Sequence, residues 1–483
     1  MNVPADFADY TRQLMGQQLY GHLERGLDSE PPVSIRLNPF KAGRGTHQAG
    51  IAMSHEPIGW CDEGYWLERR PNFTFDPLLH AGYYYVQESA SMFVSHVLRQ
   101  VVASPCTVLD LCAAPGGKST AARTVLPAGS LLVCNEPMRP RALVLSENIQ
   151  KFGHPDVIVT NNHPRDFRKA GVGFDVIIAD VPCSGEGMFR KDGGAIDEWS
   201  RQNVDNCWRL QRQIIEDIWP CLKPGGVLVY STCTFNALEN EDNLAWITTE
   251  MGAEYINIYT QPDWHITQAL TGAATAYRFI PGVSRSEGLC MAVLRKTGGE
   301  TLTIRKAREA KGREAKSNSR PMPKADITTW LTEAEAYTLT AEADTVRAIP
   351  RAWASEYRAI SRNMKVLHAG ITMGTVKGHD LIAHPSLALS TALNCSAVPQ
   401  AEVGYAQAIA YLRKEAIALP EGTPRGTVLV TYHGAALGFV KNLGNRANNL
   451  YPQEWRIKST HIPDDEPKIL SIPKIRNYHP IHD

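Results

Sequence analysis

Between residues 101 and 296, short apolar runs typical of buried strands alternate with segments that have helical periodicity. The strand-like runs are 108–111, 131–134, 157–160, 174–179, 227–230 and 289–294. The helical patterns lie between them, at 118–125, 141–152, 204–221 and 239–250. This alternation predicts an α/β fold with an open, doubly wound parallel sheet. Ligands of such sheets bind beyond the carboxyl ends of the strands, so residues at those ends are the first candidates for function.

The remaining sequence divides into further units, because 483 residues are enough for three or four domains. We expect an N-terminal domain at 1–100, the α/β domain at 101–296, a basic linker at 297–325, a small, poorly patterned intermediate domain at 326–395 and a C-terminal domain at 396–483. The N-terminal domain contains a strand-like run at 33–38 and a predicted helix around 87–94. Strand-like runs at 427–432 and 436–441 predict a hairpin in the C-terminal domain.

Composition excludes several classes of protein. Lysine plus arginine and aspartate plus glutamate are 50 each, so total charge does not indicate a nucleic-acid partner. The range 305–324, with eight Lys or Arg against two Glu, is either a solvated linker or an arm that contacts phosphates. No apolar run approaches the ~20 residues of a membrane span, and the N-terminus lacks the pattern of a signal peptide. The ten cysteines show no paired or zinc-binding spacing, which predicts reduced thiols, no metal and a cytoplasmic location.

Two cysteines directly follow predicted strands. Cys183 lies in Asp180-Val-Pro-Cys-Ser-Gly, and Cys233 lies in Ser231-Thr-Cys-Thr. Because the carboxyl ends of parallel strands meet at one edge of a sheet, we expect both thiols and Asp180 at a single crevice. A thiol in such a place can be a nucleophile where its surroundings favour the thiolate. The more usual role of a free cysteine, a small buried hydrophobe, is expected for Cys112, Cys134, Cys221 and Cys290.

The segment after the first strand of this domain predicts a cofactor-binding loop. It consists of Cys112, Ala113, Ala114, Pro115, Gly116, Gly117 and Lys118. Its glycines allow a ligand close to the backbone, and the following helix presents free amides. An NTPase phosphate loop would need glycine at position 112, which excludes that alternative. Glu136 follows Gly116 by about 20 residues, the spacing at which an acidic residue binds ribose hydroxyls.

Together these motifs resemble the NOL1/NOP2/Sun family of RNA cytosine-C5 methyltransferases, and within it the bacterial members that modify 16S ribosomal RNA. The matching segments are 34–38, 85–92, 112–118, 180–191, 230–234, 286–289 and the C-terminal hairpin. The resemblance implies a Rossmann-like class I methyltransferase core that uses S-adenosyl-L-methionine. It also implies an N-terminal RNA-binding domain, a C-terminal PUA-like β domain, and 16S rRNA or the 30S subunit as partner. We expect a monomer.

The resemblance also implies roles for the site residues. Addition of a thiolate to C6 of cytosine turns C5 into a carbon that can accept a methyl group. The family implies that Cys233 is this nucleophile, that Cys183 assists product release, and that Asp180 faces both base and cofactor. The residues alone leave the choice of nucleophile open, since DNA cytosine methyltransferases attack from a Pro-Cys motif like 182–183. The loop 112–118 and Glu136 are implied cofactor contacts.

One position departs from the family pattern. Members commonly have an aspartate near the cofactor adenine after the third strand, where this chain reads Asn161-Asn162-His163. We expect Asn162 or His163 to take that place as a cofactor contact. Arg190 and Lys191 either pair with phosphates of the flipped nucleotide or are ordinary surface charges. Three alternatives to the 16S substrate remain: tRNA or another rRNA site, a non-enzymatic ribosome-assembly factor that binds RNA, and duplex DNA.

Overall fold

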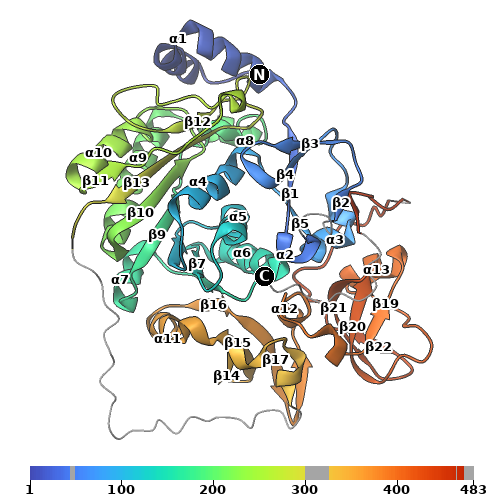
Figure 1. Cartoon of the computed structure of the whole chain (residues 1–483). Helices are drawn as coiled ribbons and strands as arrows, with labels where there is room; N and C mark the ends of the chain where they lie inside the picture. The colour runs from blue at the N-terminus through green and yellow to red at the C-terminus, as the bar shows by residue number, and fades with distance from the viewer. Residues whose placement is uncertain (44–48, 300–325, 464, 473–483) are drawn as a thin grey trace, which may run out of the picture.

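The computed structural model describes residues 1–43, 49–299, 326–463 and 465–472. Within these ranges the central sheet has nine strands in the order β11-β13-β10-β9-β6-β7-β8-β16, with β12 paired to β13 (Figure 1). The strands are β6 (Thr107–Asp110), β7 (Leu131–Asn135), β8 (Val157–Thr160), β9 (Phe174–Asp180), β10 (Leu222–Thr232), β11 (Ala253–Tyr255), β12 (Tyr277–Phe279), β13 (Leu289–Lys296) and β16 (Val366–Ala369). Five neighbouring strands of the sheet are parallel: β10, β9, β6, β7 and β8. Strand β13 lies antiparallel beside β10, and β16 lies antiparallel beside β8. The predicted Rossmann-like sheet is confirmed.

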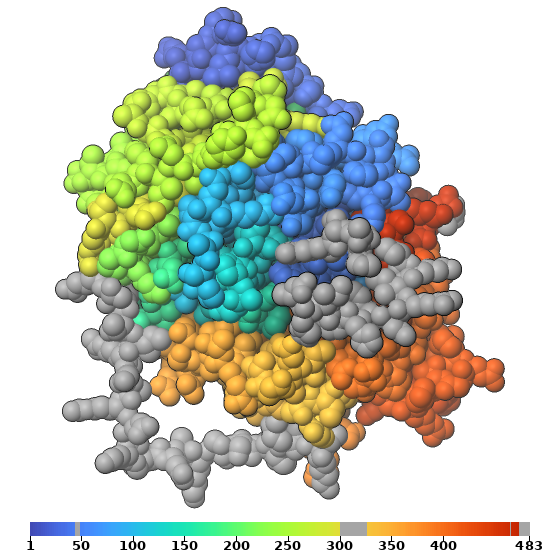
Figure 2. All heavy atoms as spheres, viewed as in Figure 1, coloured from blue at the N-terminus to red at the C-terminus, as the bar shows by residue number. Residues whose placement is uncertain are grey.

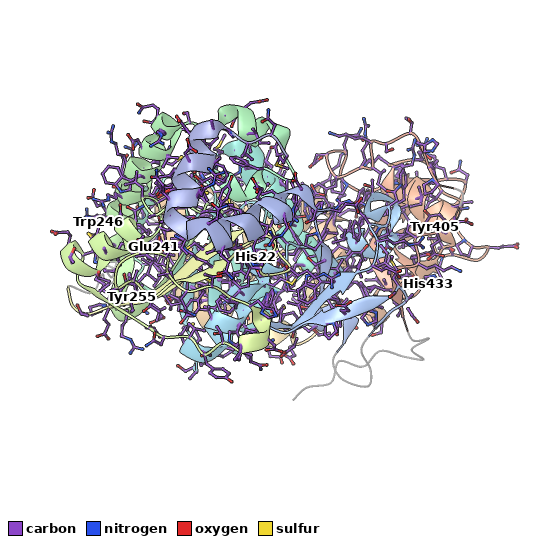
Figure 3. The ribbon with its side chains drawn as sticks, turned by 90° about the horizontal axis from the view of Figure 1, so that it is seen from above. His22, Glu241, Trp246, Tyr255, Tyr405 and His433 are labelled. Atoms are coloured by element: carbon purple, nitrogen blue, oxygen red, sulfur yellow. The ribbon has the colours of Figure 1, made fainter. Side chains whose placement is uncertain are left out.

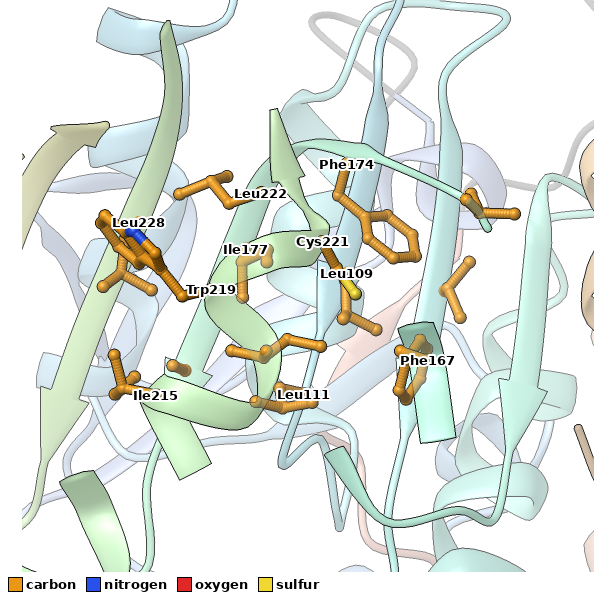
Figure 4. Packing of buried hydrophobic residues seen from close by; sticks show 14 of the residues in the cluster. Leu109, Leu111, Phe167, Phe174, Ile177, Ile215, Trp219, Cys221, Leu222 and Leu228 are labelled. Atoms are coloured by element: carbon orange, nitrogen blue, oxygen red, sulfur yellow. The ribbon is translucent and has the colours of Figure 1, made fainter. Parts of the chain in front are cut away.

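Helices cover both faces of this sheet, and successive side chains of each strand enter opposite layers. Leu109 and Ile177 pack with helices α7, α9, α10 and α11 on one face (Figure 4). Val108 and Val176 pack with α4, α5 and α6 on the other. The helices are α4 (Phe93–Val101), α5 (Gly117–Val125), α6 (Arg139–Phe152), α7 (Phe167–Ala170), α9 (Arg201–Ile218), α10 (Glu241–Glu250) and α11 (Ala354–Asn363), while the short α8 (Gly193–Glu198) precedes α9. Burial on both faces makes these strands continuous apolar runs, which is why their pattern was visible in the sequence.

The helix predicted around 87–94 begins further along the chain. A 3-10 turn covers Ala90–Met92, and α4 follows it. The carboxylate of Glu88 accepts the backbone N–H groups of Ala90 and Ser91, each at 2.9 Å, and so satisfies the start of the turn. Gln87 and Glu88 therefore lie in a loop, next to the central sheet, and not on a helix.

The N-terminal and C-terminal ranges, predicted as separate domains, share one hydrophobic core. Leu37 and Phe75 from the first belong to the same buried cluster as Leu412 and Val430 from the second. The hydroxyl of Tyr405 donates to the carbonyl of Phe75 at 3.1 Å, and strand β2 pairs with β23 across the boundary. Figure 2 shows blue and red atoms of the two ranges side by side. Figure 3 shows Tyr405 and His433 on the side of the molecule opposite Trp246 and Tyr255. We refer to this joint unit as the flanking module.

The flanking module contains two four-stranded sheets, ordered β3-β4-β1-β5 and β19-β20-β21-β22, and the two-stranded pair of β2 and β23. Its strands are β1 (Val33–Leu37), β2 (Gly50–Ile51), β3 (His55–Ile58), β4 (Cys61–Leu67), β5 (Tyr84–Val86), β19 (Gln400–Glu402), β20 (Gly426–Tyr432), β21 (Ala435–Asn442), β22 (Ala447–Asn449) and β23 (Leu470–Ser471). Its helices are α2 (Pro39–Ala42), α3 (Pro77–His80) and α13 (Tyr405–Leu412), while α1 (Ala5–Asp28) packs against α8, α9 and the segments that follow β10 and β12. The hairpin of β20 and β21 confirms the predicted one.

The range 326–395, predicted as a small intermediate domain, contributes to two sheets. Strands β14 (Tyr337–Glu342), β15 (Thr345–Pro350), β17 (Ile371–Lys377) and β18 (Asp380–Ala383) form an antiparallel sheet of their own, followed by the short α12 (Pro385–Ala388). Strand β16 instead extends the central sheet beyond β8. The basic run at 305–324 lies outside the described residues. In the ranges that the structure describes, no helix combines the length and apolar character needed to cross a bilayer.

The shared core makes a prediction about stability. Leu412 is fully buried in it, so Leu412→Ala should lower the free energy of unfolding by about 2–5 kcal/mol. Because the core belongs to both ranges, we expect hydrogen exchange to accelerate in β1 as well as in α13. Mass spectrometry of exchanged peptides measures this, with Glu421→Ala at an exposed position as the control. Acceleration restricted to the C-terminal range would show that the two ranges unfold independently.

Candidate active site

Cys183 and Cys233 lie beside each other at the carboxyl ends of β9 and β10. These strands pair in parallel, with Asp180 opposite Ser231, so the segments that follow them leave the sheet together. The two Sγ atoms are 3.2 Å apart, and both cysteines are free thiols. The backbone N–H of Cys233 also donates to Sγ of Cys183 at 3.3 Å. The expectation that the two motifs meet at one edge of the sheet is confirmed.

The pKa of Cys183 depends on the neighbouring thiol. The hydrogen bond to Cys233 and burial raise the pKa of Cys183 well above the usual range of a thiol. Cys183 therefore keeps its proton at neutral pH and can donate a hydrogen bond to the sulfur of Cys233. A hydrogen-bond donor at this distance stabilises negative charge on the neighbouring sulfur.

Asp180, the last residue of β9, is held in place from two sides. The hydroxyl of Ser231 donates to Oδ1 at 2.7 Å, and Nζ of Lys118 donates to Oδ2 at 2.9 Å. Burial by itself lowers the pKa of Lys118, but the charge of Asp180 and the hydrogen bond to it raise that pKa above its ordinary value. The site therefore contains an ammonium group that is largely buried and is fixed by its carboxylate partner.

The loop 112–118 connects β6 to α5 and turns at Gly116, whose φ of +113° is a conformation that favours glycine. Asp110, at the end of β6, accepts the hydroxyl of Ser119 at 2.6 Å and so anchors the helix that follows the loop. Its other oxygen is buried and has no hydrogen-bond partner among the described residues. Burial raises the pKa of Asp110 to about 7. Asp110 precedes the predicted loop 112–118, and only the structure shows its unpaired oxygen.

A cavity of about 170 Å³ lies between this loop and the segment after β5. One side of the cavity consists of loop residues 112–115, 117 and 118 together with Asp180. The other side comes from the N-terminal range: Tyr85, Val86, Gln87, Glu88 and Ser91. These five belong to the 85–92 motif, yet the sequence pattern assigned them no place in the site. They line the cavity only because the N-terminal range packs against the central sheet, and this packing cannot be inferred from the local sequence.

Glu136 is buried immediately after β7 and does not line this cavity. Its Oε1 accepts the N–H of Met138 at 2.9 Å, and Arg141 lies 3.5 Å from Oε2. Arg141 also donates to the carbonyl of Ala114 at 3.2 Å. The guanidinium group of Arg141 therefore connects Glu136, which follows β7, to the loop 112–118, which follows β6.

Asn162 and His163, the predicted substitutes for the aspartate, are used differently. The side-chain amide of Asn162 donates to the carbonyl of Lys365 at 3.1 Å and accepts the N–H of the same residue at 3.0 Å. Both of its polar atoms thus hold the segment that enters β16. His163 is exposed, and its backbone N–H donates to Asp166 at the start of a short 3-10 turn. In this arrangement Asn162 is a structural residue, and His163 is the one of the two with a solvent-facing side chain.

Arg190 is also structural. Its Nε donates to Glu287 at 2.9 Å, and its two terminal nitrogens donate to the carbonyls of Gly26 and Ser286, each at 2.8 Å. These bonds attach the end of α1 to the catalytic domain, which leaves the guanidinium no role toward phosphate. Lys191 is more exposed, and its Nζ lies 3.6 Å from Glu287. Among the described residues, no group of three His, Cys, Asp or Glu side chains could hold a metal ion.

Three protein-family models match successive parts of the chain. Residues 3–89 match the N-terminal domain of 16S rRNA methyltransferase RsmF, and residues 102–295 match 16S rRNA methyltransferase RsmB/F. Residues 399–457 match the PUA domain of methyltransferase RsmF. The C-terminal PUA-like domain implied by the resemblance is confirmed, as is the N-terminal domain.

Relatives of known name extend this match. A ribosomal RNA small subunit methyltransferase F from Aliivibrio fischeri is 31% identical over 446 residues, which cover 87% of this chain and 90% of the relative. The enzyme of the same name from Pectobacterium atrosepticum is 34% identical over 314 residues, or 62% of this chain and 63% of the relative.

Solved structures share the fold. NSun6 from Pyrococcus horikoshii with SFG has a TM-score of 0.52 and 19% identity, covering 61% of this chain and 99% of that chain. A methyltransferase homolog from the same organism has a TM-score of 0.51 and 24% identity, covering 60% and 94% of the two chains. The fold implied by the resemblance to the Sun family is confirmed.

The effect of Cys233 on the pKa of Cys183 can be tested without a substrate. Cys233→Ala removes the hydrogen bond that is the largest cause of the raised pKa of Cys183. We therefore expect iodoacetamide to alkylate Cys183 at lower pH in the variant than in the unaltered protein. Mass spectrometry of cysteine peptides across roughly pH 6 to 10 measures the two profiles. Cys395, exposed and far along the chain, is the internal control. An unchanged profile for Cys183 would contradict the assigned cause.

Proposed function

Because this chain belongs to the ribosomal RNA small subunit methyltransferase F family, we propose that it methylates C5 of a cytosine in 16S rRNA. The methyl donor is S-adenosylmethionine, and the protein acts as a monomer in the cytoplasm on naked 16S rRNA or the 30S subunit. One observation carries the choice of chemistry: two free thiols lie 3.2 Å apart at the ends of adjacent parallel strands, next to the Lys118–Asp180 ion pair. A covalent route through C6 of a pyrimidine needs such a nucleophile and a group that polarises the ring.

The residues around the loop fit S-adenosylmethionine. The unpaired buried oxygen of Asp110 and the free amides at the start of α5 suit its amino-acid portion. The carboxylate of Glu136, close behind the loop, suits a ribose diol. We assign loop residues 112–118, Glu136 and Asp180 to the cofactor, with His163 near the adenine and Asn162 outside it. The bound cofactor supplies an electrophilic methyl group on a sulfonium.

Cys233 is the nucleophile in this proposal. Its thiolate adds to C6, and the electron pair of the C5–C6 double bond moves into the ring and makes C5 nucleophilic. Cys183 lies 3.2 Å from the attacking sulfur and can donate a hydrogen bond to it. The assignment of Cys233 over Cys183 follows the resemblance to the family. Lys118 and Asp180 face the base: the ammonium donates a hydrogen bond to the ring edge, and Asp180 orients that ammonium.

Cys183 acts after the methyl group is on C5. The C5 proton must leave, its bonding electrons re-form the C5–C6 double bond, and the Cys233–C6 bond breaks with its pair returning to sulfur. In the adduct the sulfur of Cys233 is bonded to C6, so the hydrogen bond that chiefly raises the pKa of Cys183 is lost. Cys183 can then lose its own proton to solvent and, as a thiolate beside the adduct, accept the C5 proton. The second thiol therefore belongs to release and not to attack.

The flanking module supplies the RNA-binding surface in this proposal. It faces the α/β domain through the 85–91 segment, which lines the cavity together with the loop after β6 and Asp180. An enzyme that acts on a base must take it out of the stack, which is easier in single-stranded or looped RNA.

A methyl-transfer assay tests substrate and nucleophile together. Labelled S-adenosylmethionine is incubated with 30S subunits, naked 16S rRNA or bulk tRNA, and the labelled nucleotide is mapped. We expect 5-methylcytosine in 16S rRNA, and none with Cys233→Ala, since this proposal assigns the neighbouring thiol of Cys183 to release and not to attack. Label only in tRNA would keep the chemistry and change the substrate. Absence of label with folded protein would favour an assembly factor that binds RNA.

The release step predicts a different result for Cys183→Ala. This variant should still attack and methylate, but the adduct should persist, because elimination is slowed. We expect a protein–RNA band that survives denaturing electrophoresis and disappears in the Cys183→Ala, Cys233→Ala double variant. Unchanged turnover with no such band would refute the role of Cys183.

A further inference from the structure

The loop that carries Cys233 is held by a carboxylate from the loop of the other thiol. Glu186 follows Cys183 in the chain and is completely buried. Its Oε2 accepts the backbone N–H groups of Phe235 at 2.6 Å and Asn236 at 3.0 Å, just beyond Cys233. Two backbone donors on one carboxylate oxygen fix the path of the segment from which Cys233 projects.

The reverse contact is made by Glu239. This residue follows Cys233, is completely buried, and accepts the N–H of Ser184 at 3.1 Å, next to Cys183. Nε2 of Gln211 donates to the same oxygen at 2.6 Å. Each thiol loop therefore provides the carboxylate that holds the other loop. We refer to Glu186 and Glu239 as the carboxylate clasp.

Neutral groups connect the two halves of the clasp. The side-chain amide of Asn236 donates to Glu186 at 3.1 Å and to Glu239 at 2.7 Å. The hydroxyls of Ser184 and Thr234 are 2.9 Å apart. Within the described ranges neither carboxylate has an ion-pair partner, so neutral hydrogen-bond donors compensate two buried acids. Loss of one acceptor would leave buried N–H donors without partners, which is costly in a buried hydrogen-bond network.

The outer side of the clasp is covered as well. The hydroxyl of Tyr10 in α1 accepts the N–H of Ala237 at 2.9 Å. Arg278, paired with the Glu241 labelled in Figure 3, donates to the carbonyl of Phe235 at 2.9 Å. These contacts keep water from the clasp, so its hydrogen bonds act in a medium of low dielectric constant.

We propose that Glu186 and Glu239 are positioning residues with separate effects on the two halves of the reaction. Glu186 sets the position of Cys233 for attack, and Glu239 sets the position of Cys183 for release. The inference rests on the proposed function and adds two residues to its machinery. The charge of Glu239 also contributes, after the hydrogen bond to Cys233 and burial, to the raised pKa of Cys183.

Glutamine variants separate the two effects. Both oxygens of each carboxylate accept N–H donors, so an amide in either orientation places its NH2 against a donor. We expect Glu239→Gln to accumulate the denaturant-resistant RNA adduct, as Cys183→Ala does. We expect Glu186→Gln to form little adduct and to lose roughly 10- to 100-fold in turnover, with little change in KM for RNA. A role limited to general stability would not divide the two variants in this way.

Asp76→Asn is the matched control. Asp76 is also buried and accepts a backbone N–H from Leu78 at 2.9 Å, but it lies in the flanking module away from the thiols. The Asp76→Asn variant should have a lower melting temperature but an unchanged ratio of adduct to product. Should a glutamine variant fail to fold, Glu239→Asp and Glu186→Asp keep the charge, withdraw the acceptor, and should shift that ratio in the same directions by less.

Two results would overturn the inference. One is an equal loss of turnover in both variants with no change in the adduct fraction, and the other is less adduct in Glu239→Gln than in unaltered protein. Parallel reactions with unaltered protein and Cys183→Ala keep this failure distinct from failure of the proposed function. If those two proteins show methylation and trapped adduct while the glutamate variants do not divide, only the clasp is wrong. If they show neither, the chemistry itself is wrong.

Discussion

The parallel pairing of β9 with β10 is the constraint on which the site depends. The register that places Asp180 opposite Ser231 brings the two loops out of the sheet side by side and makes the contact between Cys183 and Cys233 possible. Backbone hydrogen bonds hold the strands, and apolar layers on both faces keep them from shifting. The central sheet is therefore rigid, and it fixes the positions of the reactive groups at its edge.

The parts around this edge come from distant regions of the sequence. Lys118 arrives from the loop after β6, and the wall formed by 85–91 arrives from the N-terminal range. The carboxylate clasp then ties the two thiol loops to each other by exchange of acceptors. A site assembled from a sheet edge, a loop and a separate wall can combine a nucleophile, a buried cation and an access path that no single segment could provide.

Much of this organisation could be predicted from sequence, and the failures have a common cause. The strands of the catalytic domain were predictable because burial on both faces makes them apolar runs, and the meeting of Cys183 with Cys233 followed from parallel strands. The hydrogen bonds of Asn162 with Lys365, 203 residues away, could not be predicted from the sequence. Arg190 was left open between phosphate and surface for the same reason, since it binds the carbonyl of Gly26 at a separation of 164 residues. Local patterns indicate elements and their ends, but they contain no information about which distant backbone group a side chain will meet.

The core shared by the two ends of the chain has a consequence for biosynthesis. The apolar face that contains Leu37 and Phe75 is made early, yet the side chains that cover it, from Ala401 to Leu470, are made much later. During translation this face stays uncovered until the range 401–470 has left the exit tunnel, and contacts between such distant segments close slowly. The nascent chain therefore exposes an apolar surface that favours aggregation throughout the synthesis of the α/β domain.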